Sequence, residues 1–445
     1  MSADNTMHMA NSFDPRGASA LDVADRELLA RRTRVLGAPY RLFYERPVHA
    51  VRGNGVLLYD AAGLDYLDAY NNVPVVGHSN PQVRERVSAQ LDVLNTHTRY
   101  LTDAVVDYAE RLTGLFDIAD AQAVFVCTGS EAVDLALRMA RHVTGRRGVI
   151  ATAHAYHGTT EAAAAISPSL GPNNPIPGEV ELVAAPDLAR EDPASAAAAF
   201  AARVTEAITA LRARGHEPAA LIVDSVMSSD GLQGTAARVL EPAAAVAGAA
   251  GALYIADEVQ AGFGRTGAWW GYPHQGVRPD LVVLGKPMGN GIPIAGVIGR
   301  PDVFEVFGRD VRYFNTFGGN PVSIAAAGAV LDELENRRLL ASASTVGDLL
   351  LRECTALAGT HGGVSAVRGS GLFLALEITD PATGAADAAR AAAIVNHMRE
   401  NRVLISASGV SANVLKVRPP LVFAESDAPR LLDALDAALA APLAG

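Results

Sequence analysis

Two short apolar runs, each followed by a residue with chemical function, constrain this chain more than any other feature. Residues 253–256 are followed by Asp257, and residues 281–284 are followed by Gly285 and Lys286. Apolar runs of this length are typical of buried parallel strands. In parallel sheets the functional groups gather at the carboxyl ends of the strands. We therefore expect Asp257 and Lys286 to lie side by side at one edge of a sheet.

A buried aspartate beside a lysine is the pair that pyridoxal phosphate chemistry requires. The carboxylate faces the pyridinium nitrogen, and the lysine forms a Schiff base with the cofactor. Taken alone, Asp257 is more often an ordinary strand-end acid and Lys286 a solvated lysine. The motifs at the other strand ends must therefore decide between these interpretations.

Strands and helices alternate along the central part of the chain. Strands are expected at residues 123–126, 148–152, 181–183, 221–223, 253–256, 281–284 and 295–298. This alternation is the signature of an α/β fold with a mostly parallel sheet. Helices are expected over residues 20–36, over 81–116 and from about 321 to 335.

The two ends of the chain have a different pattern. Residues 48–67 alternate with turn signals, which predicts a small antiparallel meander outside the main sheet. Residues 367–378, 403–406 and 415–417 are expected as strands of a second, α+β domain. A chain of 445 residues is expected to hold two domains. We expect an N-terminal segment of the small domain (1–69), a large domain (70–330) and a C-terminal small domain (331–445).

Composition excludes several classes of function. The net charge is −11 and no basic block is present, so nucleic-acid binding is not expected. Cys127 and Cys354 have no metal-ligand or CxxC spacing, which favours a reducing cytoplasm and no metal site. Residues 1–19 are polar, and the apolar run 243–256 is too short to span a bilayer. Neither a signal peptide nor a membrane association is therefore expected.

Three further motifs stand at the ends of expected strands. Cys127-Thr-Gly129-Ser130 opens a helix, where free N–H groups and a hydroxyl can hold a phosphate; the alternative is an ordinary N-cap. Tyr156, before His157-Gly158, can stack on a flat ring or lie in a surface loop. Thr316, within residues 313–321, offers another hydroxyl for an anion. With the Asp257 and Lys286 pair, these motifs favour a cofactor site.

The order of these motifs resembles the class III aminotransferase family of pyridoxal-phosphate enzymes. The resemblance runs from about Arg32 to the C-terminus and rests on residues 127–132, 156–158, 257–267, 285–291 and 315–321. It implies the fold type I architecture, in which a large domain with a mostly parallel seven-stranded sheet is joined to a smaller α+β domain. It also implies a homodimer with active sites at the subunit interface.

The resemblance implies a role for each residue around the cofactor ring. Lys286 would carry pyridoxal 5′-phosphate as a Schiff base, and Asp257 would pair with the pyridine nitrogen. Gln260 would touch the ring hydroxyl. Val259 would pack behind the ring, and Tyr156 would stack on its front face.

It also implies how the phosphate of the cofactor is held. Gly129 and Ser130 would bind it from one subunit, and Thr316 would reach the phosphate of the partner subunit's cofactor. The chain departs from the family pattern at Asp224-Ser225, where a Glu is commoner.

The segment Lys416-Val-Arg418-Pro-Pro bears on the choice of substrate. Lys416 stands where the resemblance places an arginine that grips the substrate carboxylate. Lysine is a point charge that commonly binds phosphate, whereas the planar guanidinium suits carboxylate. Positions two apart face the same side of a strand, so Lys416 and Arg418 could converge on one dianion. The alternative is a strand edge with two solvated cations, which Pro419-Pro420 favours.

Within the family, residues 70–78, 94–101, 285–291 and 413–421 resemble the ammonia-releasing phospholyases that act on ethanolamine phosphate and 5-phosphohydroxylysine. Alanine–glyoxylate aminotransferase is the next nearest relative. We therefore predict a lyase that eliminates phosphate from a phosphorylated primary amine, with Lys416, Arg418 and Asn72 as substrate-binding residues. The main alternative is an omega-type aminotransferase that uses a keto acid. A non-enzymatic relative, or an isomerase or decarboxylase, remains a further alternative.

Overall fold

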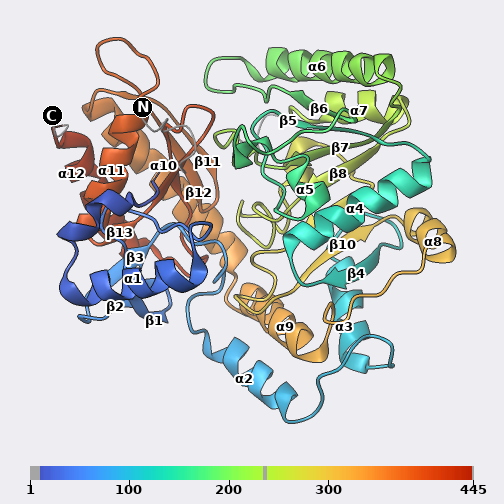
Figure 1. Cartoon of the computed structure of the whole chain (residues 1–445), viewed down its shortest axis with the longest axis horizontal. Helices are drawn as coiled ribbons and strands as arrows, with labels where there is room; N and C mark the ends of the chain where they lie inside the picture. The colour runs from blue at the N-terminus through green and yellow to red at the C-terminus, as the bar shows by residue number, and fades with distance from the viewer. Residues whose placement is uncertain (1–10, 234–237, 443–445) are drawn as a thin grey trace.

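A seven-stranded sheet forms the larger domain. The computed structural model describes residues 11–233 and 238–442. The sheet has the order β4-β10-β9-β8-β7-β5-β6 (Figure 1). Its strands are β4 (Gln122–Val126), β10 (Ala295–Gly299), β9 (Leu281–Leu284), β8 (Leu253–Asp257), β7 (Pro218–Asp224), β5 (Gly148–Thr152) and β6 (Val180–Val183). Strand β10 runs antiparallel to both neighbours, and the other neighbouring strands of this sheet pair in parallel. The mostly parallel seven-stranded sheet is therefore confirmed.

Different helices cover the two faces of this sheet. Successive side chains of a strand point to opposite sides, so neighbouring residues of one strand pack against different helices. On β7, Ala220 and Ile222 are buried in the same cluster as residues of α4, whereas Leu221 and Val223 are buried with residues of α6. Both faces are covered, which explains why the strands are continuous apolar runs. The helices within residues 81–336 are α2 (Pro81–Leu91), α3 (Asp103–Thr113), α4 (Gly129–Thr144), α5 (Glu161–Ala164), α6 (Pro193–Ala213), α7 (Glu241–Ala249), α8 (Pro301–Asp310) and α9 (Pro321–Asn336).

The prediction of one helix over residues 81–116 is wrong for residues 92–102. Helix α2 ends at Leu91 and α3 begins at Asp103, with non-helical backbone between them. The break is explained by Asn95, Thr96 and Thr98. An Asn side chain competes for backbone hydrogen bonds, and a Thr side chain loses rotamer freedom in a helix. The apolar residues that suggested continuity are largely exposed, and Leu101 is fully so.

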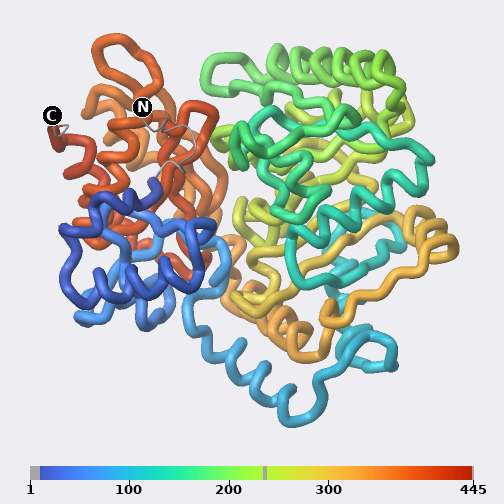
Figure 2. The backbone as a smooth tube through the Cα atoms, viewed as in Figure 1, coloured from blue at the N-terminus to red at the C-terminus, as the bar shows by residue number. Residues whose placement is uncertain are grey.

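The two ends of the chain together build a second domain, which Figures 1 and 2 show in blue and red on the left. β1 (Ala50–Asn54), β2 (Leu57–Asp60) and β3 (Asp65–Asp68) form the expected antiparallel meander. Strand β13 (Val403–Leu404) pairs with β3 in parallel, so a C-terminal strand completes this sheet. The helices of this domain are α1 (Val23–Leu36), α10 (Leu339–Thr360), α11 (Ala388–Glu400) and α12 (Ala428–Ala440).

A second four-stranded sheet faces the large domain. Its order is β11-β12-β15-β14, and its pairings are antiparallel. The strands are β11 (Val364–Ser370), β12 (Phe373–Ile378), β15 (Val414–Val417) and β14 (Ser406–Ser408). The strand expected over 367–378 is thus a hairpin, turning at Gly371 with φ of +54°. A Cβ at Gly371 would lie 2.5 Å from the Arg265 carbonyl oxygen, so only glycine fits.

The N-terminal helix has the ends that the sequence predicts. The Asp22 carboxylate accepts a hydrogen bond from the Asp25 N–H at 2.9 Å, and Gly37 ends the helix with φ of +68°. Within residues 11–233 and 238–442, no helix has the length and apolar character needed to cross a bilayer.

Candidate active site

The carboxyl ends of β7, β8 and β9 bring the central residues together. Asp224 lies opposite Asp257 in the β7–β8 pairing, and Asp257 lies opposite Val283 on β9. Lys286 follows β9 by two residues and reaches the same edge. The residues that line the cavity there are Gly129, Ser130, Tyr156, His157, Gly158, Asp257, Val259, Gln260 and Lys286. Of the eight positions expected around the cofactor, seven lie in this cavity.

The Lys286 ammonium has the environment of a reactive amine. It lies 5.8 Å from the centre of the Tyr156 ring. Burial, together with the nearby Arg418 charge, lowers the pKa of Lys286, while Asp257 and Asp224 oppose that shift. A lowered pKa increases the fraction of neutral amine, which is the form that attacks a carbonyl.

A histidine that the sequence interpretation missed orients Asp257. The His157 Nδ1 lies 2.6 Å from one carboxylate oxygen of Asp257, and the Val259 N–H donates to the other at 3.0 Å. Both side chains are buried, and His157 is held from its backbone by the Ser167 hydroxyl at 2.8 Å. The contact joins residues 100 positions apart, so only its place after Tyr156 could have suggested it.

The N-terminus of α4 leaves donors available to an anion. The N-cap of α4 is Thr128, whose hydroxyl accepts a hydrogen bond from the Glu131 N–H. In return, the Glu131 carboxylate accepts hydrogen bonds from the N–H groups of Cys127 and Thr128. Within the described ranges, no hydrogen bond uses the N–H group of Gly129 or Ser130. The Ser130 hydroxyl accepts from the Thr159 N–H at 3.1 Å. These donors at a helix N-terminus suit a phosphate.

Two glycines shape the cavity. A Cβ at Gly158, where φ is +140°, would lie 2.4 Å from the Ser130 hydroxyl oxygen. A Cβ at Gly129 would lie 3.2 Å from a Val259 methyl group, so the side chain of Val259 packs closely against this turn. Side chains at these two positions would fill space between the phosphate cradle and the Asp257 carboxylate.

Together these groups fit pyridoxal phosphate. An anion site lies at the start of α4, a carboxylate oriented by His157 lies at the end of β8, and an amine with a lowered pKa follows β9. Tyr156 and Val259 supply flat and apolar walls to the same cavity. The chemistry of this donor set matches the phosphate, the ring nitrogen and the aldehyde of the cofactor.

Lys416 lies on β15 and Arg418 directly follows this strand, where it contacts Gln260 of the cavity wall. Both side chains are buried, and both lie over the Phe373 ring, at 5.8 and 5.3 Å from its centre. They therefore face the same side, as expected for positions two apart. Strand β15 pairs with both β12 and β14, so the alternative of a strand edge with two solvated cations is wrong.

The two cations have different partners. Arg418 donates to the Tyr70 carbonyl oxygen from Nε at 3.1 Å and from Nη2 at 2.9 Å, and from Nη1 to the Gln260 side chain. For the Lys416 ammonium, no hydrogen bond or ion pair is found with any residue that the structure describes. Burial and the Arg418 and Lys286 charges lower the pKa of Lys416 to about 7, although Asp224 opposes the shift.

Asn72 and Thr316 do not line the cavity of their own chain. The Asn72 amide donates to the Gln260 carbonyl oxygen at 3.1 Å and accepts from the Arg265 Nε at 3.0 Å. These contacts favour a positioning role for Asn72 over the direct substrate contact that the sequence predicts. Thr316 is exposed in the loop before α9, where a second subunit could meet it.

The fold and the cavity define a pyridoxal-phosphate-dependent enzyme of fold type I. The chain belongs to the class III aminotransferase family, whose model matches residues 43–439. The alanine–glyoxylate aminotransferase 2-like protein of Drosophila melanogaster is 37% identical over 422 residues, covering 91% of this chain and 85% of that protein.

Two phospholyase relatives are also similar to the chain. The ethanolamine-phosphate phospho-lyase homolog 1 of Caenorhabditis elegans is 32% identical over 458 residues, covering 98% of both chains. The solved structure of a phospholyase from Arthrobacter in complex with phosphoethanolamine has a TM-score of 0.90 and 42% identity. The match covers 93% of this chain and 100% of that chain. The family resemblance and the cofactor inferred from the sequence are therefore confirmed.

Proposed function

We propose that this enzyme eliminates phosphate from a phosphorylated primary amine such as ethanolamine phosphate, and releases ammonia. The observation that carries the proposal is Lys416, whose side chain is buried and whose ammonium lies over the Phe373 ring but has no hydrogen bond or ion pair with the described residues. A buried charge without a partner is costly unless a ligand compensates it. A phosphate dianion at this position would do so.

The charges around Lys416 favour an anionic substrate group. Arg418 and Lys286 both act on it as like charges, and all three cations lie in a chain whose net charge is −11. The guanidinium of Arg418 is already held by Tyr70 and Gln260, so it adds positive potential without being free to form a new fork. This arrangement fits a compact dianion better than a carboxylate that requires bidentate recognition.

The residues of the chain have separate tasks in the proposed reaction. Pyridoxal phosphate, when bound, supplies the aldehyde that takes up the amine and a ring that accepts electrons. The Lys286 amine removes a proton from the carbon that bears the nitrogen. Asp257, held by His157, keeps the proton on the pyridine nitrogen. Lys416 binds the phosphate and stabilises its charge as the C–O bond breaks.

The overall reaction balances without a second organic substrate. Ethanolamine phosphate and water yield acetaldehyde, ammonia and phosphate, with no net oxidation. An aminotransferase, in contrast, must pass the nitrogen to a keto acid. The Arthrobacter phospholyase, a relative with phosphoethanolamine bound, supports the choice of elimination.

The initial rate of phosphate release from ethanolamine phosphate tests the proposal. We expect the same rate with and without added pyruvate or 2-oxoglutarate, and competitive inhibition by inorganic phosphate. The alternative, an omega-type aminotransferase, is supported by the similarity to the Drosophila protein. It predicts a strict requirement for a keto acid, alanine or glutamate as product, and no phosphate.

We also propose that the enzyme works as a homodimer in the cytoplasm, with Thr316 of one subunit at the phosphate of the partner's cofactor. Large apolar side chains are exposed around the Thr316 loop, as an interface requires: Tyr100, Leu101, Phe314 and Phe317. We propose residues 70–330 as the large domain, with residues 1–69 and 331–445 forming the small one. Light scattering at micromolar concentration should give twice the mass of the 46.3 kDa chain.

A further inference from the structure

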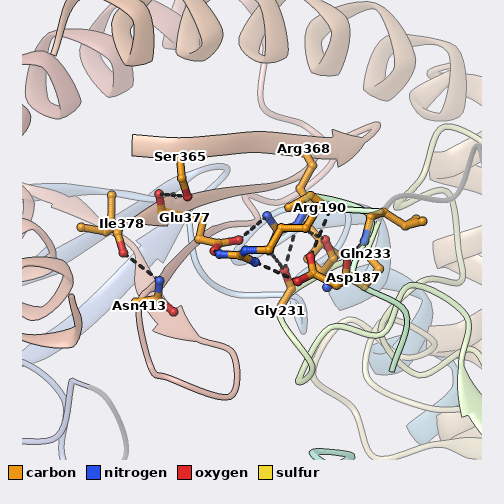
Figure 3. Close-up of polar contacts among 12 residues, drawn as sticks. Asp187, Arg190, Gly231, Gln233, Ser365, Arg368, Glu377, Ile378 and Asn413 are labelled. Carbon is orange, nitrogen blue, oxygen red and sulfur yellow. Dashed lines mark hydrogen bonds and ion pairs between the residues drawn. The ribbon is translucent and has the colours of Figure 1, made fainter. Parts of the chain in front are cut away.

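An ionic cluster joins the small domain to the large domain beside the catalytic cavity (Figure 3). Glu377, on β12, is buried and contacts two arginines. One carboxylate oxygen lies 2.5 Å from Arg190 Nη2, and the other lies 3.0 Å from Arg368 Nη1. Arg190 also pairs with Asp187 at 2.8 Å. Glu377 and Arg368 belong to the small domain, whereas Arg190 and Asp187 lie between β6 and α6 of the large domain.

Arg368 also donates hydrogen bonds to the backbone of a second segment of the large domain. Its Nη2 donates to the Gly231 carbonyl oxygen at 2.7 Å, and its Nε donates to that of Leu232 at 2.8 Å. We call residues 224–233 the acid loop, because they contain Asp224 and Asp230. Its first residue, Asp224, is the last residue of β7, so the start of the loop is fixed by the sheet and its far end is held from the other domain.

The acid loop has a backbone that needs such support. Met227 has φ of +50°, and Leu232 has φ of +57°. Side chains with a Cβ rarely adopt this left-handed conformation, and it persists where surrounding contacts hold it. The Leu232 N–H donates to the Met227 carbonyl oxygen at 3.0 Å, which closes the loop on itself. The arginine contacts to Gly231 and Leu232 are therefore placed where the loop is most strained.

The acid loop holds two acids at the carboxyl ends of β7 and β5. Asp230 is buried and accepts from the Thr152 hydroxyl at 2.7 Å and from the His154 N–H at 3.2 Å. Asp224 accepts from the Ser228 N–H at 2.9 Å, and its charge acts on Lys416. Because Asp224 is the last residue of β7, the loop acts on it through the hydrogen bonds from Val226 and Ser228, which orient its carboxylate.

Apolar packing also joins the loop to the small domain, because Val226 and Leu232 are buried in one small cluster with Phe373, Ala375 and Val414. A cleft of about 460 Å³ separates the two domains here. Its lining includes Arg190, Gln233, Arg368, Glu377 and Asn413. Solvent can therefore reach the outer side of the cluster. Of the two arginines that contact Glu377, Arg190 is more exposed than Arg368. At the edge of the cleft, beside this apolar cluster, the loop is held by the Arg368 hydrogen bonds.

We propose that Arg368, oriented by Glu377, is a positioning residue that clamps the acid loop to the small domain, and that this clamp determines how tightly the site binds a phosphate group. The second part rests on the proposed function. Removing the charge of Glu377 would leave Arg368 and Arg190 without their shared anion, and the loop would open more often. The Asp224 carboxylate would then lose the hydrogen bonds from Val226 and Ser228 that orient it, and its effect on the charge of Lys416 would change.

Hydrogen exchange of the holoenzyme tests the clamp without any substrate. In Glu377→Gln and in Arg368→Met, we expect amides of the acid loop to exchange about tenfold faster, while amides of β8 and β9 keep their wild-type rates. Glu217→Gln is the matched control, because it removes an exposed arginine pair, with Arg212, from the end of α6. Unchanged loop exchange in both test variants would overturn the proposal.

A third variant keeps the test decisive if those two fail to fold. Arg190→Gln removes only the more exposed of the two arginines, and we expect a smaller acceleration, of about threefold, confined to the acid loop. Wild-type exchange in Arg190→Gln would then overturn the clamp.

Binding of inorganic phosphate separates the two parts of the inference. We expect its affinity for the holoenzyme to change about tenfold in Glu377→Gln and to stay unchanged in Glu217→Gln. Faster loop exchange with unaltered phosphate affinity would refute the link to Lys416. A wild-type enzyme that binds no phosphate would instead refute the proposed function, while the exchange data would still decide the clamp.

Discussion

Replacing Lys416 with methionine should separate substrate recognition from catalysis. Methionine has a similar length and an apolar end, so it fills the space of a side chain that makes no hydrogen bond to the residues that the structure describes. A hydrogen bond to a charged group is worth about 1.5–3 kcal/mol, which corresponds to a KM for ethanolamine phosphate that is about 10- to 150-fold higher. The KM of an unphosphorylated primary amine should hardly change.

The pH dependence of the same variant gives a second, independent signature. Because the pKa of Lys416 is lowered to about 7, the free enzyme loses this positive charge as the pH rises through that value. Phosphate affinity should therefore fall above about pH 7 in the wild type and show no such step in Lys416→Met. The unfolded lysine keeps its proton up to a pKa of about 10.4, so this group adds stability as the pH rises from 7 toward 10.

Steady-state kinetics and phosphate inhibition, measured from pH 6 to 9, check this prediction. The cofactor absorbance of Lys416→Met should match the wild type, which shows that the site has stayed intact. Equal loss of activity toward phosphorylated and unphosphorylated amines would refute the reasoning, because Lys416 would then serve the reaction in general and not the phosphate.

Three further substitutions test the cofactor site. Lys286→Ala should abolish turnover and still bind pyridoxal phosphate non-covalently, and borohydride reduction of the wild type followed by peptide mapping should label Lys286; a label elsewhere would contradict the assignment. Asp257→Asn should lower kcat by at least about a hundredfold with an unchanged melting temperature, because an isosteric amide no longer stabilises the ring cation; near-normal turnover would remove Asp257 from its role. Thr316→Ala should weaken cofactor binding by about tenfold, the scale of one hydrogen bond to a charged group. Mixing it with Lys286→Ala should regenerate one intact site per dimer, and no recovery of activity would argue against a shared site.

Much of the fold could be predicted because the strands of the large sheet are buried on both faces. Such strands are continuous apolar runs, and the residues that follow them must meet at one edge. This local pattern was enough to place Asp257 and Lys286 together. Helix 81–116 could not be predicted correctly, because the apolar residues between α2 and α3 are exposed and do not indicate packing within the chain.

The parts of the site that the sequence could not predict are contacts between distant segments. His157 reaches Asp257, and Arg418 reaches Tyr70 across 348 positions. Pro419-Pro420 suggested a strand edge, but the short strand β14 pairs with β15 and buries Lys416. Asn72 was expected at the substrate because of its segment, whereas its amide is engaged by Arg265 and Gln260. Such pairings depend on how the two domains meet, which leaves no periodic trace in the sequence.

The stoichiometry of a closed reaction tests the central claim most directly. Purified enzyme with ethanolamine phosphate, and with no keto acid present, should form phosphate and ammonia in equal amounts, far in excess of the enzyme and with its cofactor unchanged. If the reaction instead stops after one equivalent per active site, with the cofactor converted to its amine form and no phosphate released, the enzyme is an aminotransferase and the proposed elimination is wrong.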